Sequence, residues 1–334
     1  MLKTIPLQHQ RSWQDCLTDL VTDPMELLNM LDLDPDQLDL SLDVLLEFPL
    51  RLPRTFIQRM QRGNPNDPLL LQVLPQQSEL LDSPGFVSDP LAEREFNPMP
   101  GILHKYAGRV LLLPTSSCAI HCRYCFRRHF PYAENRPDKK QWLQSLQYIR
   151  SDPSLTEVIL SGGDPLLISD KHLEWLLEHL AAMPHIKRIR IHTRMPVVIP
   201  QRISQKLCDL FTRYPLRFIV VMHINHAQEL DDEVKAACDR LKEANVDLLN
   251  QSVLLKNIND DPHTLIALSE RLFACGIMPY YLHMLDKVKG SSHFDVDLQI
   301  AKSLMSRLRA ELPGYLVPRL VREEAASANK TPLF

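Results

Sequence analysis

Apolar and polar residues follow a regular alternation of two patterns over the second two-thirds of the chain. Short apolar runs, typical of buried strands, occur at 109–114, 157–161, 186–193, 218–224, 247–254 and 277–285. Segments with apolar residues every three or four positions, typical of helices, lie at about 138–150, 169–182, 202–213, 229–244, 263–275 and 296–310. The pattern therefore predicts six strand–helix units in succession.

Such an alternation predicts a parallel sheet, because each helix returns the chain to the same edge before the next strand begins. No G-x-G-x-x-G motif follows the first strand, and six unbroken units favour an incomplete (β/α)6 barrel over a Rossmann sheet. We expect an α/β protein with three regions: a mainly helical N-terminal region (1–104), the partial barrel (105–312) and a C-terminal tail (313–334).

Charge and composition exclude several classes of partner. The 334 residues include 38 Lys and Arg against 41 Asp and Glu, a formal net charge of −3, so we expect no nucleic-acid partner. The N-terminus lacks an apolar signal-peptide core and no apolar run reaches membrane-spanning length, so we expect a cytoplasmic protein without a membrane partner. Seven cysteines in a reducing compartment suggest metal ligands more than a disulfide framework.

Three of these cysteines stand close together in TSSCAIHCRYCFRRHFPY, directly after the first barrel strand. Cys118, Cys122 and Cys125 have the spacing C-x-x-x-C-x-x-C. Three thiolates can bind three irons of a [4Fe–4S] cluster and leave the fourth iron open, whereas structural zinc usually takes four protein ligands. A zinc site completed by His121 or His129 stays open as an alternative.

The carboxyl ends of the other predicted strands also carry polar residues. In a (β/α) barrel these ends surround the active site. They carry Gly162, Gly163 and Asp164, then His192, Thr193 and Arg194, then His223, Gln251, His283 and Asp286. We therefore expect one site at this edge of the sheet.

The cysteine spacing, with Tyr124 before the third cysteine, resembles the radical S-adenosylmethionine superfamily. Further stretches resemble one of its branches, the lysine 2,3-aminomutases, from about residue 89 to the C-terminus. In the order of that family the chain shows HKYAGRVLLLPTSSCAIHCRYCFRRHF, SGGDPL, HINHAQEL, NQSVLL, PYYLHMLD, SHF and VPRLVREEAASANKTP.

The resemblance implies three cofactors and the residues that hold them. A [4Fe–4S] cluster would be bound by Cys118, Cys122 and Cys125, and S-adenosylmethionine would bind at the open iron. The residues that match its contacts are Gly162, Gly163, Asp164, His223 and Gln251. Pyridoxal 5′-phosphate would be held as an imine on Lys330, with the tail folded over the barrel mouth, and its phosphate positions match Lys105, Tyr106 and Arg109. Lys105 stands where an arginine is usual in that family.

The resemblance also implies L-lysine as the substrate, converted to (R)-β-lysine by a radical 1,2-amino shift. Arg127 matches the partner of the substrate carboxylate, and Asp286 and Glu323 match the partners of its side-chain ammonium. Glu323 stands where an aspartate is usual. Aminomutases acting on arginine or glutamate, and a radical S-adenosylmethionine enzyme without pyridoxal phosphate, are the alternatives.

The expected partners follow from the same resemblance. A one-electron reductase or a flavodoxin-like protein would reduce the cluster. The chain resembles the short bacterial branch of the family, and has Asp261 where the longer enzymes have a further cysteine. That branch supplies β-lysine for the modification of translation elongation factor P, which implies a functional link to the enzyme that transfers the lysyl group.

Overall fold

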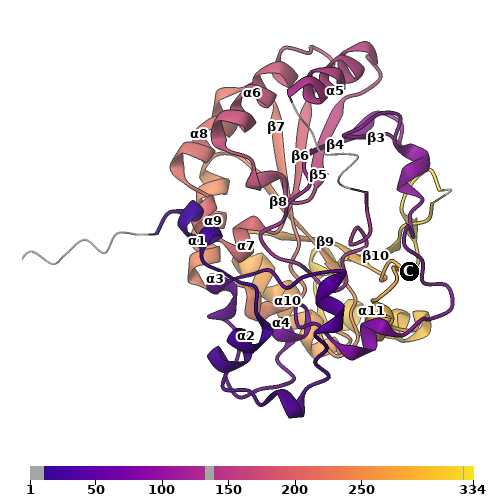
Figure 1. Ribbon diagram of the computed structural model, residues 1–334. Coiled ribbons are helices and arrows are strands. Elements are labelled where there is room, and N and C mark those ends of the chain that lie inside the picture. Colours follow the sequence, from indigo (N-terminus) through magenta and orange to yellow (C-terminus); the bar gives the residue numbers. More distant parts are fainter. Residues whose placement is uncertain (1–10, 132–138, 326) are drawn as a thin grey trace, which may run out of the picture.

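One open sheet forms the centre of the molecule. The computed structural model describes residues 11–131, 139–325 and 327–334. Within these residues nine strands form a single sheet in which the strands lie in chain order. They are β3 (Ile102–Leu103), β4 (Arg109–Thr115), β5 (Glu157–Gly162), β6 (Arg188–Thr193), β7 (Arg217–Met222), β8 (Asp247–Val253), β9 (Met278–His283), β10 (Arg319–Arg322) and β11 (Thr331–Pro332). Figure 1 shows these strands with helices along their outer side.

The six predicted strands correspond to β4–β9, and neighbours among them pair in parallel as expected. The structure adds a seventh parallel strand, β10, beside β9, and the sheet ends in two antiparallel strands, β3 and β11. The expectation of six strands was therefore one parallel strand short. The reason is that β10 spans only four residues, two of them arginines, and so has no distinct apolar run.

The predicted helices are also present. They are α5 (Lys139–Ser151), α6 (Asp170–Ala181), α8 (Gln205–Arg213), α9 (Asp232–Glu243), α10 (Pro262–Ala274) and α11 (Leu298–Glu311). Side chains of Ser169, Ser204, Asp231 and Asp261 accept hydrogen bonds from the first-turn amides of α6, α8, α9 and α10 and so define where these helices begin. One further helix, α7 (Met195–Val198), makes a single turn after β6.

The N-terminal region consists of short elements that pack on the barrel helices. They are α1 (Trp13–Thr18), β1 (Leu20–Val21), α2 (Pro24–Met30), β2 (Leu52–Pro53), α3 (Arg54–Ile57) and α4 (Pro68–Leu71). Trp13, Leu28, Phe56 and Leu70 belong to the same hydrophobic cluster as the apolar face of the sheet. This region therefore has no separate core within the described residues.

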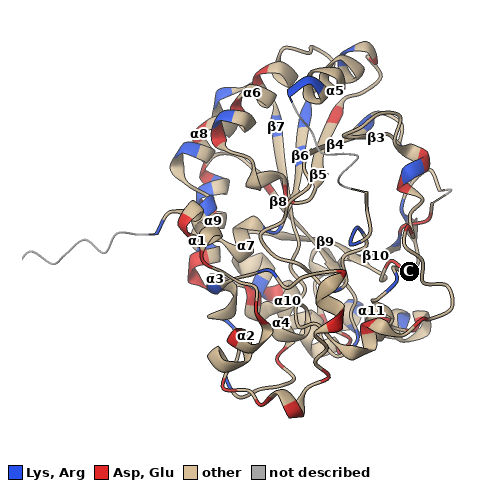
Figure 2. Cartoon of the chain, viewed as in Figure 1, with Lys and Arg blue, Asp and Glu red and all other residues tan. Residues whose placement is uncertain are grey.

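Charged residues of both signs are spread over the outer helices, as Figure 2 shows for α6, α8 and α9. This distribution agrees with the small formal net charge of −3. Among the described residues, no helix has the length and apolar character needed to cross a membrane.

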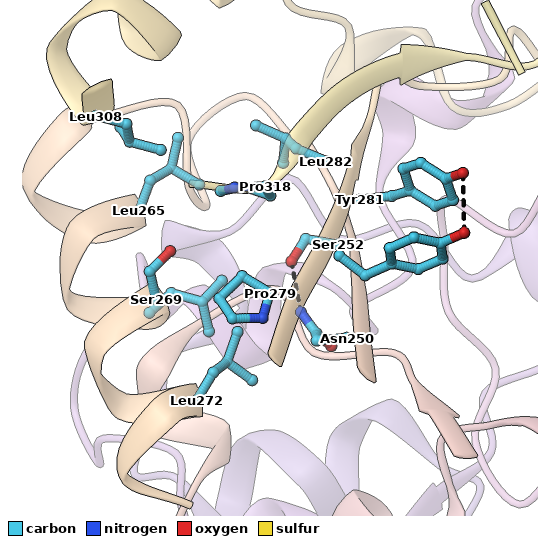
Figure 3. Close-up of a pocket in the computed structure, with 12 residues that line it drawn as sticks. Asn250, Ser252, Leu265, Ser269, Leu272, Pro279, Tyr281, Leu282, Leu308 and Pro318 are labelled. Atoms are coloured by element: carbon cyan, nitrogen blue, oxygen red, sulfur yellow. Dashed lines mark hydrogen bonds between the residues drawn. The ribbon is translucent and has the colours of Figure 1, made fainter. Parts of the chain in front are cut away.

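The two faces of the sheet differ in polarity. Along β5 and β6, Val158, Leu160, Ile189 and Ile191 belong to the main hydrophobic cluster, whereas the alternate residues do not. On β9, Leu282 packs in a second cluster with α10 and α11, and Figure 3 shows the Tyr281 ring on the side of the strands away from α10. The small cavity in that figure, about 10 Å³, lies between the strands and α10. The opposite face of the sheet, here called the inner face, does not pack on the helices and is thus free to carry polar groups.

Candidate active site

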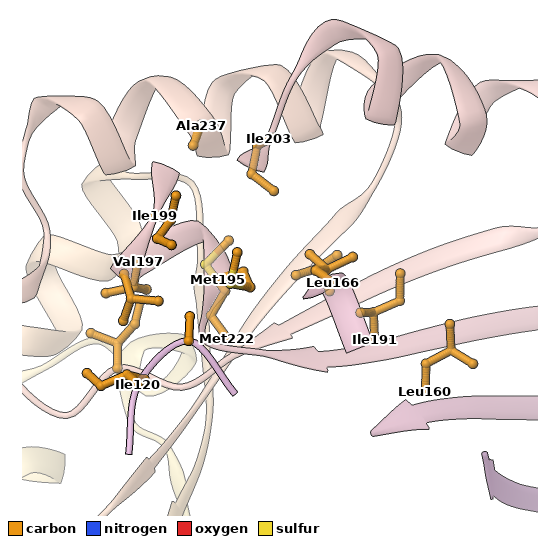
Figure 4. Packing of buried hydrophobic residues seen from close by; sticks show 14 of the residues in the cluster. Ile120, Leu160, Leu166, Ile191, Met195, Val197, Ile199, Ile203, Met222 and Ala237 are labelled. Carbon is orange, nitrogen blue, oxygen red and sulfur yellow. The ribbon is translucent and has the colours of Figure 1, made fainter. Parts of the chain in front are cut away.

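The cysteine loop follows β4 and rests on the core through Ile120. Ile120 is 5% exposed and lies beside Val197 and Met222 in Figure 4. The Cys125 amide donates to the Cys122 carbonyl at 3.0 Å, which turns the loop back on itself. Burial raises the pKa of the Cys125 thiol to about 11 and that of Cys118 well above its usual value. Ionisation of these thiols therefore needs a positively charged partner such as iron.

The histidines of the zinc alternative have other partners. His121 Nδ1 lies 2.8 Å from the Pro49 carbonyl oxygen, and His129 Nε2 lies 3.2 Å from the Lys289 carbonyl oxygen. In the part of the chain that the structure describes, no three His, Cys, Asp or Glu side chains are placed to hold a single metal ion. In a [4Fe–4S] cluster, by contrast, each cysteine binds a different iron.

Residues of the N-terminal region bind the cysteine loop through buried hydrogen bonds and ion pairs. Arg123, which stands between Cys122 and Cys125 in the sequence, is fully buried. It donates to both oxygens of Glu79 at 2.8 and 2.6 Å. Arg128 also pairs with Glu79 at 2.8 Å, and the Arg123 amide donates to the Gln72 carbonyl at 2.9 Å. The sequence offers no signal for Glu79 and Gln72, because isolated polar residues in an acidic, proline-rich segment are usually solvated.

The glycine segment after β5 lies directly against the cysteine loop. A Cβ atom on Gly163 would overlap the Ser117 carbonyl, and Gly162 has φ +111°, so both positions favour glycine. The Asp164 carboxylate, predicted from the resemblance to contact S-adenosylmethionine, accepts from Thr193 Oγ1 at 2.6 Å and from the Arg194 amide at 2.7 Å. Its carboxylate therefore joins the glycine segment to the turn between β6 and α7.

Three histidines and a glutamine gather on the inner face. Gln251 Nε2 lies 2.9 Å from His223 Nε2, and the rings of His192 and His223 are 6.1 Å apart. Burial lowers the pKa of His223 to about 3, and those of His192 and His283 fall well below their usual value for the same reason. Within the described residues, Nε2 of His192 and of His283 is buried without a hydrogen-bond partner. The site therefore presents neutral imidazoles with unused polar atoms.

Lys330 lies between β10 and β11 and reaches this face. Its ammonium group donates to Glu323, and its Nζ stands 5.8 Å from the centre of the Tyr281 ring. Tyr106 also donates to Glu323, and Lys105 Nζ lies 3.3 Å from the same carboxylate. The Arg109 guanidinium covers the Tyr106 ring at 4.6 Å. The structure thus places the residues that were predicted to bind the phosphate close to Lys330.

The two predicted acidic residues have opposite pKa shifts. Burial raises the pKa of Asp286 to about 7, although the Lys330 charge opposes the rise. Burial also raises the pKa of Glu323, but the charge and hydrogen bond of Lys330 outweigh it and bring the value to about 2. The Lys330 charge acts on both carboxyls, so both belong to the site that contains Lys330.

Arg127 is brought to the same edge of the sheet. Its guanidinium donates to both oxygens of Glu93 at 2.6 and 2.8 Å, and to Ser161 Oγ at 3.0 Å. The Arg127 charge lowers the pKa of Asp286, His192 and His223, so Arg127 belongs to the same site. Glu93 was not predicted, and it compensates the buried charge of Arg127.

Comparisons with known proteins agree on one group. Residues 112–268 match the family model of the radical SAM superfamily. The L-lysine 2,3-aminomutase of Escherichia coli (strain K12) is 50% identical over 331 residues, which cover 99% of this chain and 96% of that protein. The enzyme of that name from Haemophilus influenzae is 47% identical, covering 97% of this chain and 96% of that protein.

More distant relatives align over a smaller share of this chain and of their own length. The L-lysine 2,3-aminomutase of Clostridium subterminale is 36% identical over 280 residues, which cover 84% of this chain and 67% of that protein. A solved radical SAM methyltransferase from Sphaerobacter thermophilus gives a TM-score of 0.48 at 17% identity, covering 66% of this chain and 68% of that chain.

Proposed function

The chain belongs to the lysine 2,3-aminomutase family of radical SAM isomerases, and we propose from this that it converts L-lysine to (R)-β-lysine. Membership of the radical SAM superfamily implies a [4Fe–4S] cluster and S-adenosylmethionine. Pyridoxal 5′-phosphate, the substrate and the residue roles are parts of the proposal.

The cysteine loop fits the proposed cluster. Cys118, Cys122 and Cys125 lie on one loop at the carboxyl edge of the sheet, and thiolates are the usual ligands of iron–sulfur clusters. Gly162 and Gly163 allow the backbone close to the loop, and the His223–Gln251 pair offers polar atoms on the inner face. These four residues and Asp164 would contact S-adenosylmethionine, and Asp164 would also hold the glycine segment in place.

The surroundings of Lys330 fit pyridoxal phosphate. Its amine pairs with Glu323, which also accepts from Tyr106, and the cations Lys105 and Arg109 both lie against the Tyr106 ring and would bind the phosphate. The buried, unpartnered Nε2 of His283 offers a further polar contact within the described residues. Lys330 would therefore hold this cofactor.

One observation supports the choice of substrate: Glu323 already pairs with a primary ammonium, that of Lys330, whose charge also acts on Asp286. The side chain of L-lysine ends in the same group. When Lys330 is engaged by the cofactor, Glu323 becomes available to the substrate's ammonium. Arg127, whose charge acts on the same pocket, would then bind the substrate carboxylate.

In the proposed amino shift, the cofactors supply the reactive groups and the side chains orient the substrate. When bound, the cluster with S-adenosylmethionine supplies a radical that can break an unactivated C–H bond, and pyridoxal phosphate supplies an aldehyde that carries the moving amino group. Arg127, Asp286 and Glu323 would hold both ends of lysine and so fix its orientation. Lys330 can hold or release a proton at Nζ beside Glu323. The neutral histidines line the site without adding charge.

The activity is tested with anaerobically purified, iron-reconstituted protein. It is incubated with S-adenosylmethionine, pyridoxal phosphate, dithionite and one amino acid at a time. We expect β-lysine from L-lysine and no product from L-arginine or L-glutamate. Turnover of arginine or glutamate instead of lysine would contradict the assignment of the substrate.

The cofactor residue is tested separately. Borohydride reduction in the presence of pyridoxal phosphate should leave a pyridoxyl group on Lys330, located by mass spectrometry of peptides. Lys330→Ala should lose the label and the aminomutase activity, with iron content unchanged. Labelling of another lysine would show that the cofactor is bound elsewhere.

A role in supplying β-lysine for elongation factor P is part of the same proposal. It follows from the resemblance to the short bacterial branch of the family, and the E. coli relative is more similar to this chain, at 50% identity, than the Clostridium subterminale relative, at 36%. Cells without the gene should lack the β-lysyl group on elongation factor P, as measured by mass spectrometry. Added β-lysine should restore it.

A further inference from the structure

Arg194 has no role in the proposed reaction, yet its side chain contacts a cysteine of the loop. It follows β6 and is 4% exposed. Its Nη1 donates to Cys122 Sγ at 2.8 Å, and its Nη2 donates to Glu229 at 2.9 Å and to the side-chain oxygen of Gln72 at 2.6 Å. The guanidinium thus joins a sulfur atom to a fully buried carboxylate.

The guanidinium is held firmly in this position. Its own amide donates to Asp164, and its side chain lies 5.1 Å from the centre of the Phe56 ring. Glu229 is also fixed, because its second oxygen accepts from the amides of Asn225 and His226 at 2.9 and 3.1 Å. The contact with Cys122 is therefore part of a rigid network.

One donor of this group lacks an acceptor. Within the described residues, Nε of Arg194 is buried without a hydrogen-bond partner. A buried donor without an acceptor is destabilising, and the sulfur atoms of an iron–sulfur cluster are acceptors. This orphan donor is a second observation, independent of the Cys122 contact, that points to a sulfur-rich group beside Arg194.

The charges of Arg194 and Glu229 predict opposite effects on the reduction potential of the cluster. A reduced cluster carries one more negative charge than the oxidised cluster, and hydrogen bonds to cluster sulfurs and local charge set its reduction potential. The Arg194 cation favours the reduced form, whereas the Glu229 carboxylate opposes it.

We propose that Arg194 is a positioning residue for the cluster, which sets its reduction potential through the hydrogen bond to Cys122 and a positive charge offset by Glu229. The proposal rests on the assignment of Cys118, Cys122 and Cys125 to the cluster. Arg194 makes the cluster easier to reduce by one electron, and Glu229 limits this effect.

The test is a redox titration of the full-length protein with its reconstituted cluster, without S-adenosylmethionine or lysine. Dithionite supplies the electron, and the reduced cluster is counted by electron paramagnetic resonance. Glu229→Gln should raise the potential. Arg194→Met should lower it, and Arg194→Lys, which keeps the charge but loses the planar fork, should lower it less.

A double variant and a matched control separate this effect from general damage. Arg194→Met leaves Glu229 buried without a counter-charge, which can unfold the protein, so Arg194→Met with Glu229→Gln removes both charges together. This double variant should have a lower potential than Glu229→Gln alone. The control is Arg202→Met with Asp170→Asn, a buried pair at 2.8 Å whose arginine donates to the Leu166 and Ile168 carbonyls. It should leave the potential unchanged.

The outcomes distinguish the two proposals. If wild-type protein binds no iron–sulfur cluster, the proposed function fails. If the cluster is present but the Glu229 and Arg194 variants shift its potential in the same direction, or not at all, only the role of Arg194 is wrong. An equal shift in the Arg202 control would also overturn it.

Discussion

Asp286 and Glu323 share a pocket but differ in charge state, because only Glu323 has the Lys330 ammonium as a direct partner. Burial without such a partner keeps the pKa of Asp286 at about 7, whereas that of Glu323 falls to about 2. Near neutral pH Asp286 is therefore only partly ionised, while Glu323 is fully ionised.

We predict a pH dependence of lysine binding from this difference. A carboxylate attracts the substrate ammonium only when ionised, so lysine should bind more tightly as the pH rises from about 6 to about 8. Asp286→Asn should weaken binding by about 3–5 kcal/mol if the substrate's charge is left unpaired in the buried site. It should also remove this pH dependence, while Asp239→Asn, on the surface of α9 and paired with Lys235, should not. Binding of lysine to the protein loaded with pyridoxal phosphate can be measured by calorimetry. An unchanged pH profile in Asp286→Asn would assign the titration to another group.

The same pKa has the opposite consequence for folding. Because burial raises the pKa of Asp286 above its unfolded value, this group stabilises the fold below the unfolded pKa, and the contribution is lost as the pH rises through about 7. The site therefore gains affinity for lysine at the pH where this residue lowers stability.

The cysteine loop gives a second prediction for single residues. Cys118→Ala, Cys122→Ala and Cys125→Ala should each lose most of the bound iron, because two thiolates are too few to hold the cluster. Cys208→Ala is the control, since Cys208 lies on the buried side of α8 and belongs to the hydrophobic cluster. Iron and sulfide analysis after anaerobic reconstitution measures the effect. Full iron content in a variant of the triplet would refute the ligand assignment.

Site residues differ in how well they could be predicted from the sequence around them. The three cysteines stand out by spacing alone, whereas the prediction for Lys330 comes only from the resemblance to a family, because its surroundings in the sequence are polar. Glu93 could not be found in this way, because a glutamate in the acidic stretch LAEREF looks like a solvated charge. Its role becomes visible only when the fold brings it to Arg127.

At the scale of elements, long periodic segments were predicted and short ones were not. β4–β9 and their helices have enough residues for their apolar period to be visible. The four-residue β10, the two-residue β11 and the single turn of α7 have no such period. β10 forms because β9 offers an unpaired backbone edge, and β11 pairs in turn with β10.

The contact between the glycine segment and the cysteine loop predicts an effect of one methyl group. Gly163→Ala should displace the loop, because the added Cβ would meet the Ser117 backbone, and overpacking of this kind costs about 1–3 kcal/mol. We expect a lower melting temperature and reduced iron content. Gly314→Ala is the matched control, since nothing lies within 4 Å of its added Cβ. Equal iron content in the two variants would show that the loop can adjust.

At the scale of the whole molecule, the N-terminal region supports the chemistry without supplying it. Glu79 and Arg123 are 44 positions apart, and neither lies in a periodic segment, so their pairing is set by the complete fold. The sequence therefore predicted the barrel and its site edge, but not the support behind the cysteine loop.

This support can be tested by breaking the pair. Glu79→Gln should destabilise the protein by about 3–5 kcal/mol, because two arginines would be left buried without a full counter-charge. Iron content should fall although every cysteine is present. The comparison is Asp247→Asn in the half-exposed pair with Arg217, where a much smaller loss of stability is expected because solvent screens the two charges. Chemical denaturation measures both, and equal losses would contradict the role of Glu79.

The order of the strands also bears on how the protein is made. Each strand from β4 to β11 pairs with the one synthesised just before it, so the sheet can grow by one strand at a time as the chain leaves the ribosome. The contacts of the cysteine loop include residues as far apart in the chain as Gln72 and Gly290, whereas Glu323 and Lys330 are translated after both of these residues. A nascent chain can therefore complete its iron-binding part well before it can engage an amino acid.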